Sequence, residues 1–289
     1  MKNILSTVSA LRDGTVILEY LRRDMNLSAT LVKKVKYGGV FINGENVHMR
    51  AVLRAGDTVE VRLPEESSEN IMAYPMQLEV IYEDEWMIAV NKPRGMPTHP
   101  SRGNSLPTLA EGIMAYFGDD FVFRAVNRLD RDTGGIVLIA KDQISAARLS
   151  EIMKRGGFSK KYEAVVMGLP TEAHGVIDAP IARECEGNMR RVVRDDGKRA
   201  VTEYRVLREI DGERSLVEIT LHTGRTHQIR VHMAHIGHPL FADFLYGEKV
   251  SGENYLLHAK ELRFIHPFTN EEIVLESAAR FGAVRNSPK

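Results

Sequence analysis

The chain has 289 residues, more than a typical single domain, and this length suits one large globular domain with a small one beside it. Its 39 Lys and Arg residues balance 39 Asp and Glu residues, so the whole chain lacks the basic excess common among nucleic-acid-binding proteins. Cys185 is the only cysteine, which excludes an internal disulfide and a thiolate-rich zinc site.

The apolar runs and the first residues of the chain predict its compartment. No run of about 18 apolar residues occurs, and the N-terminus does not open a signal-peptide pattern. We therefore expect a soluble, cytoplasmic protein without a membrane partner. No sequence feature demands more than a monomer.

The first 63 residues predict two helices followed by a small sheet. An apolar pattern at helical spacing begins at Ile17, and Ser28 is a good N-cap for a second helix that Gly38-Gly39 ends. An apolar strand, the hairpin signal Asn43-Gly44 and a further strand-like run complete the segment.

Lysines of the second helix give this segment a basic surface. Lys33, Lys34 and Lys36 interleave with apolar positions and therefore project largely from the other side of the helix. Residues 1–63 carry 10 Lys and Arg against 6 Asp and Glu, a net charge of +4, and the remainder carries −4. A polyanion should meet this segment first, although such a lysine cluster is equally well a solvated face.

Residues 14–63 resemble the small RNA-binding domain named after ribosomal small-subunit protein four, most clearly in the turn and in Leu53-Arg54-Ala55-Gly56-Asp57-Thr58-Val59. The resemblance implies a small α+β domain at residues 1–63 whose three lysines bind structured RNA. Residues 64–70 are acidic, polar and without periodicity, which predicts a linker over 64–75. A second domain should then span 76–289.

Beyond residue 75 the pattern predicts many strands and few helices. Strand-like runs at 78–82 and 87–90 surround an acidic turn, and apolar runs follow at 135–140, 162–167, 201–207 and 215–221. One helix should run from an Asp142 cap to Gly156-Gly157. Because strands and helices do not alternate regularly, we expect an α+β fold with a mixed, mostly antiparallel central sheet.

The densest polar motif is Asn127-Arg128-Leu129-Asp130-Arg131-Asp132-Thr133-Gly134-Gly135, directly before an apolar strand. Loops at strand ends are where a rigid scaffold presents reactive groups. Taken without further context, however, two carboxylates among two arginines indicate a structural ion-pair cluster more often than an active site.

A second polar cluster, at residues 223–234, follows a strand and becomes helical. This region holds four histidines: His227, His232, His235 and His238. Imidazoles three apart on a helix can share a metal, so a zinc site is one interpretation. No cysteine accompanies them and the carboxylate of Asp243 is distant in sequence, whereas a Gly-Arg turn before a helix suits an anionic group. We therefore expect no metal.

Six motifs in order, over about residues 76–268, resemble the ribosomal large-subunit and transfer-RNA family of pseudouridine synthases. The signature Arg-Leu-Asp-x-x-Thr-x-Gly stands at 128–135. The others are Asn91-Lys92-Pro93-Arg94-Gly95-Met96-Pro97-Thr98-His99-Pro100, Lys160-Lys161-Tyr162-Glu163-Ala164-Val165-Val166, Thr223-Gly224-Arg225-Thr226-His227-Gln228-Ile229-Arg230, Gly237-His238-Pro239-Leu240 with Asp243 and Tyr246-Gly247, and Leu256-Leu257-His258-Ala259 with Phe264-Ile265-His266-Pro267. Many members carry the small RNA-binding domain, so the two resemblances support each other.

The family resemblance implies an isomerase that breaks the glycosidic bond of a chosen uridine, turns the uracil and joins its carbon 5 to the sugar, without a cofactor. Asp130 would be the essential carboxylate, either a nucleophile at carbon 1′ or a base at carbon 2′. Arg225 would be its ion-pair partner, and Tyr162 would face the target base. We expect ribosomal RNA as the partner, with transfer RNA as the alternative.

The resemblance also implies residues that bind the substrate. Arg128 would lie against the RNA where the uridine leaves its stack, and Leu257, or its neighbour Leu256, would form an apolar pocket wall. The remaining implied substrate-binding residues are Thr133, His227, Gln228 and Arg230. Without the motifs, Arg128 is equally well an ion-pair partner of Asp132, and Tyr162 is an ordinary core tyrosine.

Two positions depart from the family pattern. Many members have His where this chain has Asn127, and Ser or Thr where it has Gly134. Neither position is the aspartate, so the departures bear on the sub-branch and its target.

Two rival interpretations are a non-catalytic RNA-binding or assembly protein that keeps the fold and a zinc-dependent hydrolase. The intact set of Asp130, Tyr162 and Arg225 argues against the first, and metal analysis separates the second.

Overall fold

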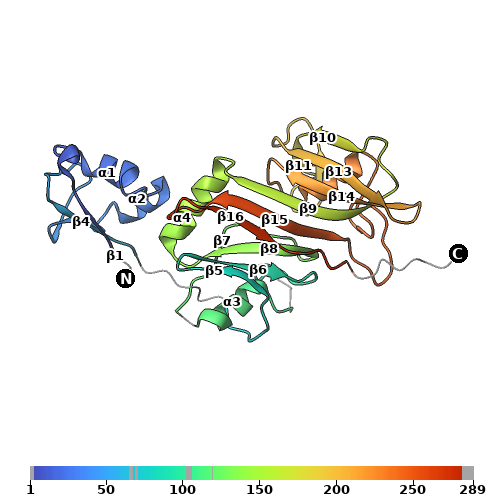
Figure 1. Cartoon of the computed structure of the whole chain (residues 1–289), viewed down its shortest axis with the longest axis horizontal. Coiled ribbons are helices and arrows are strands. Elements are labelled where there is room, and N and C mark those ends of the chain that lie inside the picture. The colour runs from blue at the N-terminus through green and yellow to red at the C-terminus, as the bar shows by residue number, and fades with distance from the viewer. Residues whose placement is uncertain (1–2, 65–67, 69–70, 102–105, 119, 282–289) are drawn as a thin grey trace.

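The computed structural model describes residues 3–64, 68, 71–101, 106–118 and 120–281. Most of its strands belong to two sheets, a small one near the N-terminus and a large one in the rest of the chain (Figure 1). The linker expected at 64–75 lies partly outside the described residues, at 65–67 and 69–70. No helix in the described part is long and apolar enough to cross a membrane.

The N-terminal unit is a four-stranded sheet covered by two helices, with strand order β1-β4-β2-β3. Its elements are β1 (Asn3–Thr7), a single 3₁₀ turn (Ala10–Arg12), α1 (Ile17–Arg23), α2 (Ala29–Val35), β2 (Val40–Ile42), β3 (Glu45–Asn46) and β4 (Thr58–Arg62). Ser28 caps α2 as expected, its hydroxyl accepting from the Leu31 N–H at 3.2 Å. Asn43 and Gly44 have φ of 51° and 87°, as a primed hairpin turn requires. β1, which pairs with β4, is an element that the sequence did not predict.

The N-terminal unit contacts the remainder of the chain through helix α4 (Gln143–Lys154), which lies beside α2 (Figure 1). Ile144 and Ala147 of α4 pack against the small apolar core. The Gln143 amide donates to the Pro64 carbonyl at 2.7 Å. Asp142 caps α4 by accepting from the Ile144 and Ser145 N–H groups, as the sequence predicted.

The large sheet has the strand order β10-β13-β14-β9-β15-β8-β6-β5, with β16 on β15 and β7 on β8. Its strands are β5 (Val80–Glu83), β6 (Met87–Lys92), β7 (Arg124–Ala125), β8 (Thr133–Ala140), β9 (Phe158–Met167), β10 (His174–Asp178), β13 (Val201–Glu209), β14 (Arg214–Leu221), β15 (Leu257–Ile265) and β16 (Glu272–Glu276). All these pairings are antiparallel except β8 with β15. The predicted α+β class and the mixed, mostly antiparallel sheet are confirmed.

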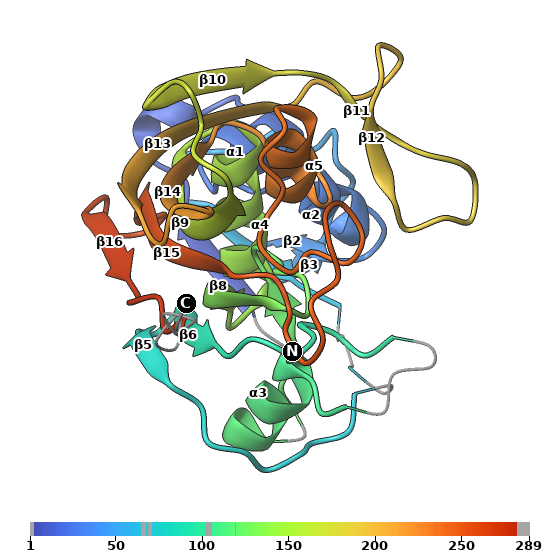
Figure 2. The ribbon, with the colours of Figure 1, turned by 90° about the vertical axis from the view of Figure 1, so that its right-hand side faces the viewer.

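Two further helices and a hairpin complete the fold. Helix α3 (Leu109–Phe117) begins at a capping box made by Thr108 and Glu111, and α5 (Gln228–His235) follows β14. The strands β11 (Ile181–Arg183) and β12 (Arg191–Val193) form a separate hairpin that projects from the body beside α5 (Figure 2).

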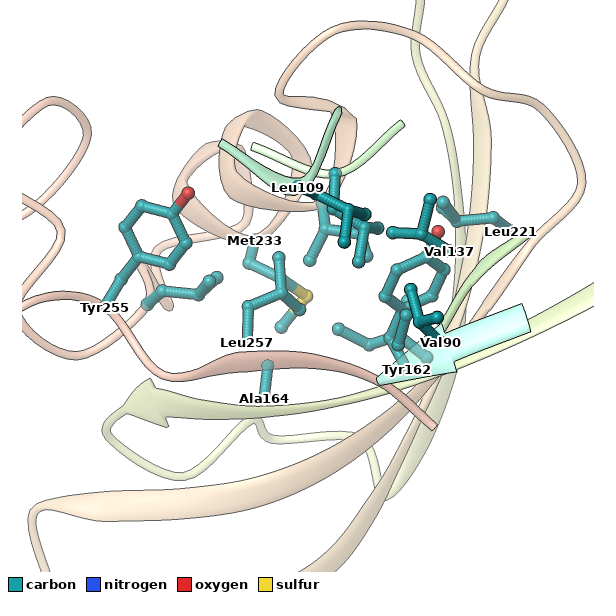
Figure 3. Close-up of a cluster of buried hydrophobic side chains, with 14 of the residues drawn as sticks. Val90, Leu109, Val137, Tyr162, Ala164, Leu221, Met233, Tyr255 and Leu257 are labelled. Atoms are coloured by element: carbon teal, nitrogen blue, oxygen red, sulfur yellow. The ribbon is translucent and has the colours of Figure 1, made fainter. Parts of the chain in front are cut away.

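Alternating side chains of the central strands fill a core on each face of the large sheet. On β6, Ile88 and Val90 join the cluster that contains α3 and α5, while Met87 and Ala89 join the cluster that contains α4. The first cluster includes Tyr162 and Leu257 (Figure 3). The face with α3 and α5 is therefore the one that meets the signature loop before β8.

The parallel seam between β8 and β15 depends on Gly135. This residue pairs with Ala259 and has φ of 109°. A Cβ at this position would collide with the backbone oxygen of Ala259 and lie 2.6 Å from its nitrogen. Only glycine permits this approach, which sets Thr133 opposite Leu257 just beyond the Asp130 loop.

We expect Gly135→Ala to lower the free energy of unfolding by about 3 kcal/mol or more, because it combines a strained φ with a backbone collision. The matched control is Gly156→Ala, whose φ is 76° but whose Cβ would meet open space. That change should cost about 1 kcal/mol. Urea unfolding of the two variants measures the difference, and equal losses would show that the seam tolerates a side chain.

Candidate active site

The signature loop holds its backbone firmly and presents the Asp130 side chain. The Asn127 amide donates to the Ile136 carbonyl at 3.0 Å and accepts from the Leu138 N–H at 2.8 Å. Thr98 exchanges hydrogen bonds with the backbone of buried Leu129 at 2.8 and 3.3 Å. Between these anchors the Asp130 side chain is 36% exposed. The loop therefore presents a partly exposed carboxylate on a fixed backbone.

Lys92, at the end of β6, connects the motif at residues 91–100 to the signature loop. Its side chain is fully buried, and its Nζ donates to the carbonyls of Pro93, Met96 and Arg131 at 3.0, 2.7 and 3.1 Å. Burial lowers the pKa of Lys92 to about 7, against the opposing effect of nearby Asp132 and Asp130. The sequence motif contained this lysine but did not predict its structural role.

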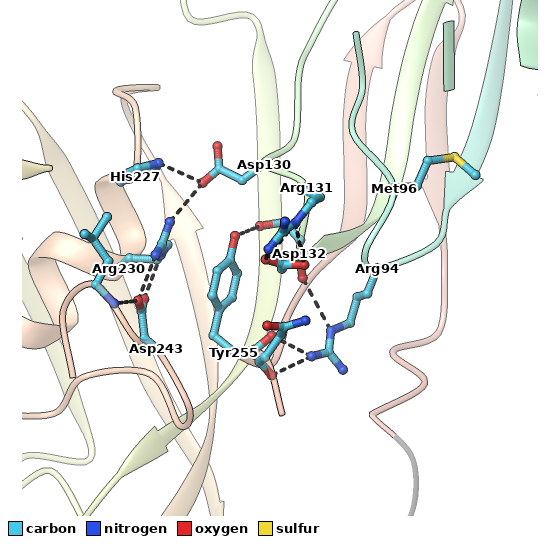
Figure 4. A network of polar contacts seen from close by, with 12 residues as sticks. Arg94, Met96, Asp130, Arg131, Asp132, His227, Arg230, Asp243 and Tyr255 are labelled. Carbon is cyan, nitrogen blue, oxygen red and sulfur yellow. Dashed lines mark hydrogen bonds and ion pairs between the residues drawn. The ribbon is translucent and has the colours of Figure 1, made fainter. Parts of the chain in front are cut away.

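The guanidinium that faces Asp130 belongs to Arg230 of α5. Its Nη1 lies 3.7 Å from Asp130 Oδ2, while Nε and Nη2 donate to the two oxygens of Asp243 at 2.7 Å each (Figure 4). The same guanidinium stands over the rings of Tyr246 and Tyr255, at 4.9 and 4.3 Å from their centroids. Burial acts to lower the pKa of Arg230, but its carboxylate partners outweigh burial and raise it.

The expectation that Arg225 pairs with Asp130 is wrong. Arg225 lies before α5, is exposed, and donates from Nε to the Arg199 carbonyl at 2.9 Å. Arg230 was expected only to bind substrate, yet it stands between Ile229 and Val231 in a buried helical stretch. A buried guanidinium requires a buried carboxylate, so this apolar context could have selected Arg230 over Arg225.

Gln228, the first residue of α5, is buried and hydrogen-bonded within the protein. Its buried amide accepts from Thr223 Oγ1 and the Arg225 N–H at 2.8 and 2.9 Å, and donates to the Val201 carbonyl and Thr202 Oγ1 at 3.0 Å each. All of its hydrogen-bonding groups are thus engaged within the protein. Gln228 thereby anchors the start of α5 to β13. This structural role is one that the sequence did not predict, and its expected role in substrate binding stays a prediction.

His227 reaches Asp130 from the N-cap of α5. Its Nε2 lies 3.7 Å from Asp130 Oδ2, and its Nδ1 is 2.8 Å from the Tyr246 hydroxyl. Burial lowers the pKa of His227, with Asp130 acting in the opposite direction, so the ring is neutral near pH 7. The residue has φ of 57°, a left-handed conformation that is uncommon for a non-glycine residue.

Apolar residues border the carboxylate on the side of the sheet. Tyr162 of β9 and Leu257 of β15 belong to one buried cluster, 9% and 4% exposed (Figure 3). Leu256 is equally buried but is not part of that cluster, which favours Leu257 as the pocket-wall leucine. Burial and, secondarily, the Asp130 charge raise the pKa of Tyr162 to about 12, so its hydroxyl stays protonated. Thr133 is buried, with its hydroxyl 3.3 Å from that of Tyr255.

Arg128 does not pair with Asp132. The Asp132 carboxylate is bound by Arg131, at 2.8 Å from Nη2, and is nearly fully buried. Arg128 itself is exposed, and no ion pair to it is found among the described residues. The ion-pair interpretation of Arg128 is therefore wrong, and its guanidinium faces solvent beside the Asp130 loop.

Three of the four histidines near α5, His227, His232 and His238, make separate contacts. Both ring nitrogens of His232 are hydrogen-bonded, to Thr202 Oγ1 and to the Ala179 carbonyl, at 2.9 Å each. His238 Nδ1 lies 2.9 Å from the Met167 carbonyl. Within the described ranges, no three His, Cys, Asp or Glu side chains are grouped as a metal site would require.

Taken together, the geometry places a cation and an imidazole against one oxygen of a partly exposed carboxylate, next to an apolar wall. A neutral flat ring could pack on that wall while the carboxylate acts on an atom beside it. The arrangement suits nucleophilic or general-base chemistry on an uncharged group.

We expect Arg230→Met to lower the free energy of unfolding by about 3–5 kcal/mol, because it leaves the fully buried Asp243 without its partner. Arg225→Met should change it by less than about 0.5 kcal/mol, because that side chain is exposed. Adding Asp243→Leu to Arg230→Met should restore part of the loss. Urea unfolding tests all three, and a larger loss for Arg225→Met would contradict this assignment of the buried ion pair.

The chain is similar to a family of RNA-modifying enzymes. The family model described as RNA pseudouridylate synthase matches residues 86–235, a range that contains Asp130, Tyr162 and α5. The uncharacterized RNA pseudouridine synthase YjbO of Bacillus subtilis is 40% identical over 257 residues, covering 86% of this chain and 90% of that protein. Ribosomal large subunit pseudouridine synthase D of Xanthomonas campestris is 37% identical over 259 residues, covering 83% and 77%.

A solved structure shares the fold. The structure titled Human RNA Pseudouridylate Synthase Domain Containing 1 matches with a TM-score of 0.60 and 27% sequence identity, covering 71% of this chain and 84% of that one. Since the family model matches more than half of the chain and the relatives match most of it, the chain belongs to the RNA pseudouridylate synthase family and is an isomerase whose substrate is RNA.

Proposed function

We propose that this enzyme converts chosen uridines of large-subunit ribosomal RNA to pseudouridine and that Asp130 is its catalytic residue. The observation that carries the assignment is the carboxylate of Asp130, partly exposed and faced at 3.7 Å by both Arg230 and His227. The choice of RNA is supported by the 37% identity to a protein named Ribosomal large subunit pseudouridine synthase D.

In the proposed reaction, Asp130 acts on the ribose of the target uridine, at carbon 1′ as a nucleophile or at carbon 2′ as a base. The positive charge of Arg230 faces the Asp130 carboxylate at 3.7 Å and attracts its negative charge. Uridine and pseudouridine are isomers, so the reaction consumes no redox equivalent or group donor, and we propose that no cofactor takes part.

The apolar wall holds the uracil while it is detached from the sugar. In our proposal the face of Tyr162 lies against the base, and Leu257 closes the pocket beside it, opposite Thr133 across the β8–β15 seam. Both are held by the core cluster, so they keep their positions while the base turns. Such a wall gives the uracil room to rotate because it offers no directional bond.

We further propose that Lys33, Lys34 and Lys36 bind RNA. Their side chains are exposed along and just beyond α2, and the exposed Tyr37 ring lies 5.0 Å from Lys36 Nζ. An exposed aromatic ring beside lysines suits a nucleic acid, because rings stack on bases while ammonium groups neutralise phosphates. The neutral charge of the whole chain makes such a local cluster necessary for attraction.

We expect Asp130→Asn to abolish pseudouridine formation, to below about one hundredth of the wild-type rate, because the amide keeps the shape and loses nucleophilicity and basicity. RNA binding and the unfolding midpoint should change little. Single-turnover assays on total RNA from a strain lacking the protein, followed by pseudouridine mapping, test both the catalytic role of Asp130 and the choice of ribosomal RNA. Formation at a normal rate would reject Asp130 as catalyst, and sites found only in transfer RNA would reject the ribosomal target.

We expect Arg128→Ala to slow the reaction strongly on a stem-loop whose target uridine is stacked, and much less on RNA in which that uridine is bulged out. A guanidinium that fills the vacated space offsets unstacking that costs on the order of a few kcal/mol. Arg131→Ala is the matched control, because Arg131 steadies the same loop through Asp132 and its loss should harm both substrates alike. Equal fold losses for Arg128→Ala on the two RNAs, at saturating protein, would show that Arg128 does not help the uridine to leave its stack.

A further inference from the structure

A chain of polar contacts leads from the projecting hairpin to the catalytic carboxylate. The backbone N–H of Arg191, at the start of β12, donates to the Tyr246 hydroxyl at 2.9 Å. That hydroxyl lies 2.8 Å from His227 Nδ1, and His227 Nε2 lies 3.7 Å from Asp130 Oδ2. The hairpin, the loop after α5 and the Asp130 loop are thus connected through Tyr246 and His227.

The first contact determines where the hydrogen atoms of the others lie. A backbone N–H only donates, so the Tyr246 oxygen accepts from Arg191 and its own proton is available for His227 Nδ1. A neutral imidazole has a single N–H, and when Nδ1 accepts from Tyr246 this N–H is on Nε2, the nitrogen that faces Asp130. The opposite tautomer would set a lone pair against the carboxylate, which is repulsive.

Electrostatics around the ring favour its neutral form. Burial, Arg230 and Arg191 all lower the pKa of His227, whereas Asp130 and Asp243 raise it, and the net direction is downward. The imidazole therefore acts as an uncharged donor with one defined hydrogen.

The two donors at Asp130 share a single oxygen. Both His227 Nε2 and Arg230 Nη1 lie 3.7 Å from Oδ2, and none of the described residues makes a hydrogen bond or ion pair with Oδ1 (Figure 4). A distance of 3.7 Å exceeds a hydrogen bond, but such contacts often shorten when substrate excludes water. One side of the carboxylate is thus anchored and the other is open.

We propose that His227 is a positioning residue whose Nε2–H, set by Tyr246, joins Arg230 in anchoring Oδ2 of Asp130, so that Oδ1 is the oxygen that acts on the ribose. This inference rests on the proposed catalytic role of Asp130. It assigns a purpose to the left-handed φ of 57° at His227, a strained conformation that turns the ring toward the loop.

Two substitutions at His227 separate this role from a backbone role. In His227→Gln the amide nitrogen reaches the position of Nε2 and keeps a donor to Asp130. In His227→Asn the amide reaches only the position of Nδ1, although Asn tolerates the left-handed conformation better. We expect the Gln variant to stay within about fivefold of wild type, and the Asn variant to lose on the order of 10²-fold in the single-turnover rate, as misplaced catalytic groups do. The affinity of both variants for RNA is measured separately, so that a loss of rate is distinguished from a loss of binding.

Tyr246→Phe tests the tautomer. The substitution keeps the ring over Arg230 and removes only the hydroxyl. It should slow the wild-type enzyme about tenfold, the size expected when a partner that orients a functional histidine is lost. It should slow the His227→Gln enzyme no further, because an amide has no tautomer to fix. A double-mutant cycle measures this coupling, and additive losses would contradict the proposal that Tyr246 sets the tautomer of His227.

The experiment uses the full-length chain and total RNA from a strain lacking the protein, with unfolding midpoints measured for every variant. If Asp130→Asn is active, the proposed function itself fails. If Asp130→Asn is inactive but His227→Asn is as fast as His227→Gln or faster, the positioning inference alone is overturned. A slow His227→Asn with a normal unfolding midpoint and a rapid His227→Gln support it.

Discussion

The buried pair between Arg230 and Asp243 is the constraint on which the site depends. Asp243 is fully buried and takes two nitrogens of the guanidinium, and its Oδ1 also accepts from the Leu245 and Tyr246 N–H groups at 3.1 and 3.3 Å. One carboxylate therefore fixes the first turn of α5, the chain that follows α5, and the direction of the remaining guanidinium nitrogen. That nitrogen faces Asp130, and the same chain brings Tyr246 to His227.

The opposite side of the site is fixed by backbone rather than by charge. The β8–β15 seam closes on Gly135, Asn127 holds two backbone groups of β8, and Lys92 holds three carbonyls around the loop. The site thus forms where a charge network on α5 meets a rigid strand end, and Asp130 is the residue common to both. Functional groups on such a scaffold are positioned accurately because the strands and the ion-pair network that hold them are rigid.

The strands and helix starts that depend on residues close together in the sequence were predictable from it. Apolar runs predicted β8, β9, β13 and β14, and cap residues such as Ser28 and Asp142 predicted the helix starts. The identity of the Asp130 partner was not predictable in this way. Both arginines flank the start of α5, and which one faces inward depends on the left-handed backbone of His227, after which the helix begins at Gln228. A positive φ at a non-glycine residue leaves no signal in spacing or composition.

Contacts made by irregular segments were equally unpredictable from the sequence. Tyr246 and Tyr255 lie in loops without periodicity, so their approach to Arg230 from two directions required the assembled fold. The N-terminal strand β1 was missed for a related reason, since its partner β4 lies more than 50 residues away in sequence.

Gly134 has a consequence for the side chains that its neighbours can carry. A Cβ there would lie 3.1 Å from Arg94 Cγ and from His258 Nδ1. Neither neighbour is free to retreat, because Arg94 donates to the carbonyls of Asn254 and Tyr255, and His258 Nε2 is 3.0 Å from Ser277 Oγ. A side chain at position 134 of this chain would therefore require one of these neighbours to shift by a few tenths of an ångström. The side chains that residues 94 and 258 can carry thus depend on the absence of a side chain at residue 134, and a substitution at any one of the three should alter what the other two tolerate.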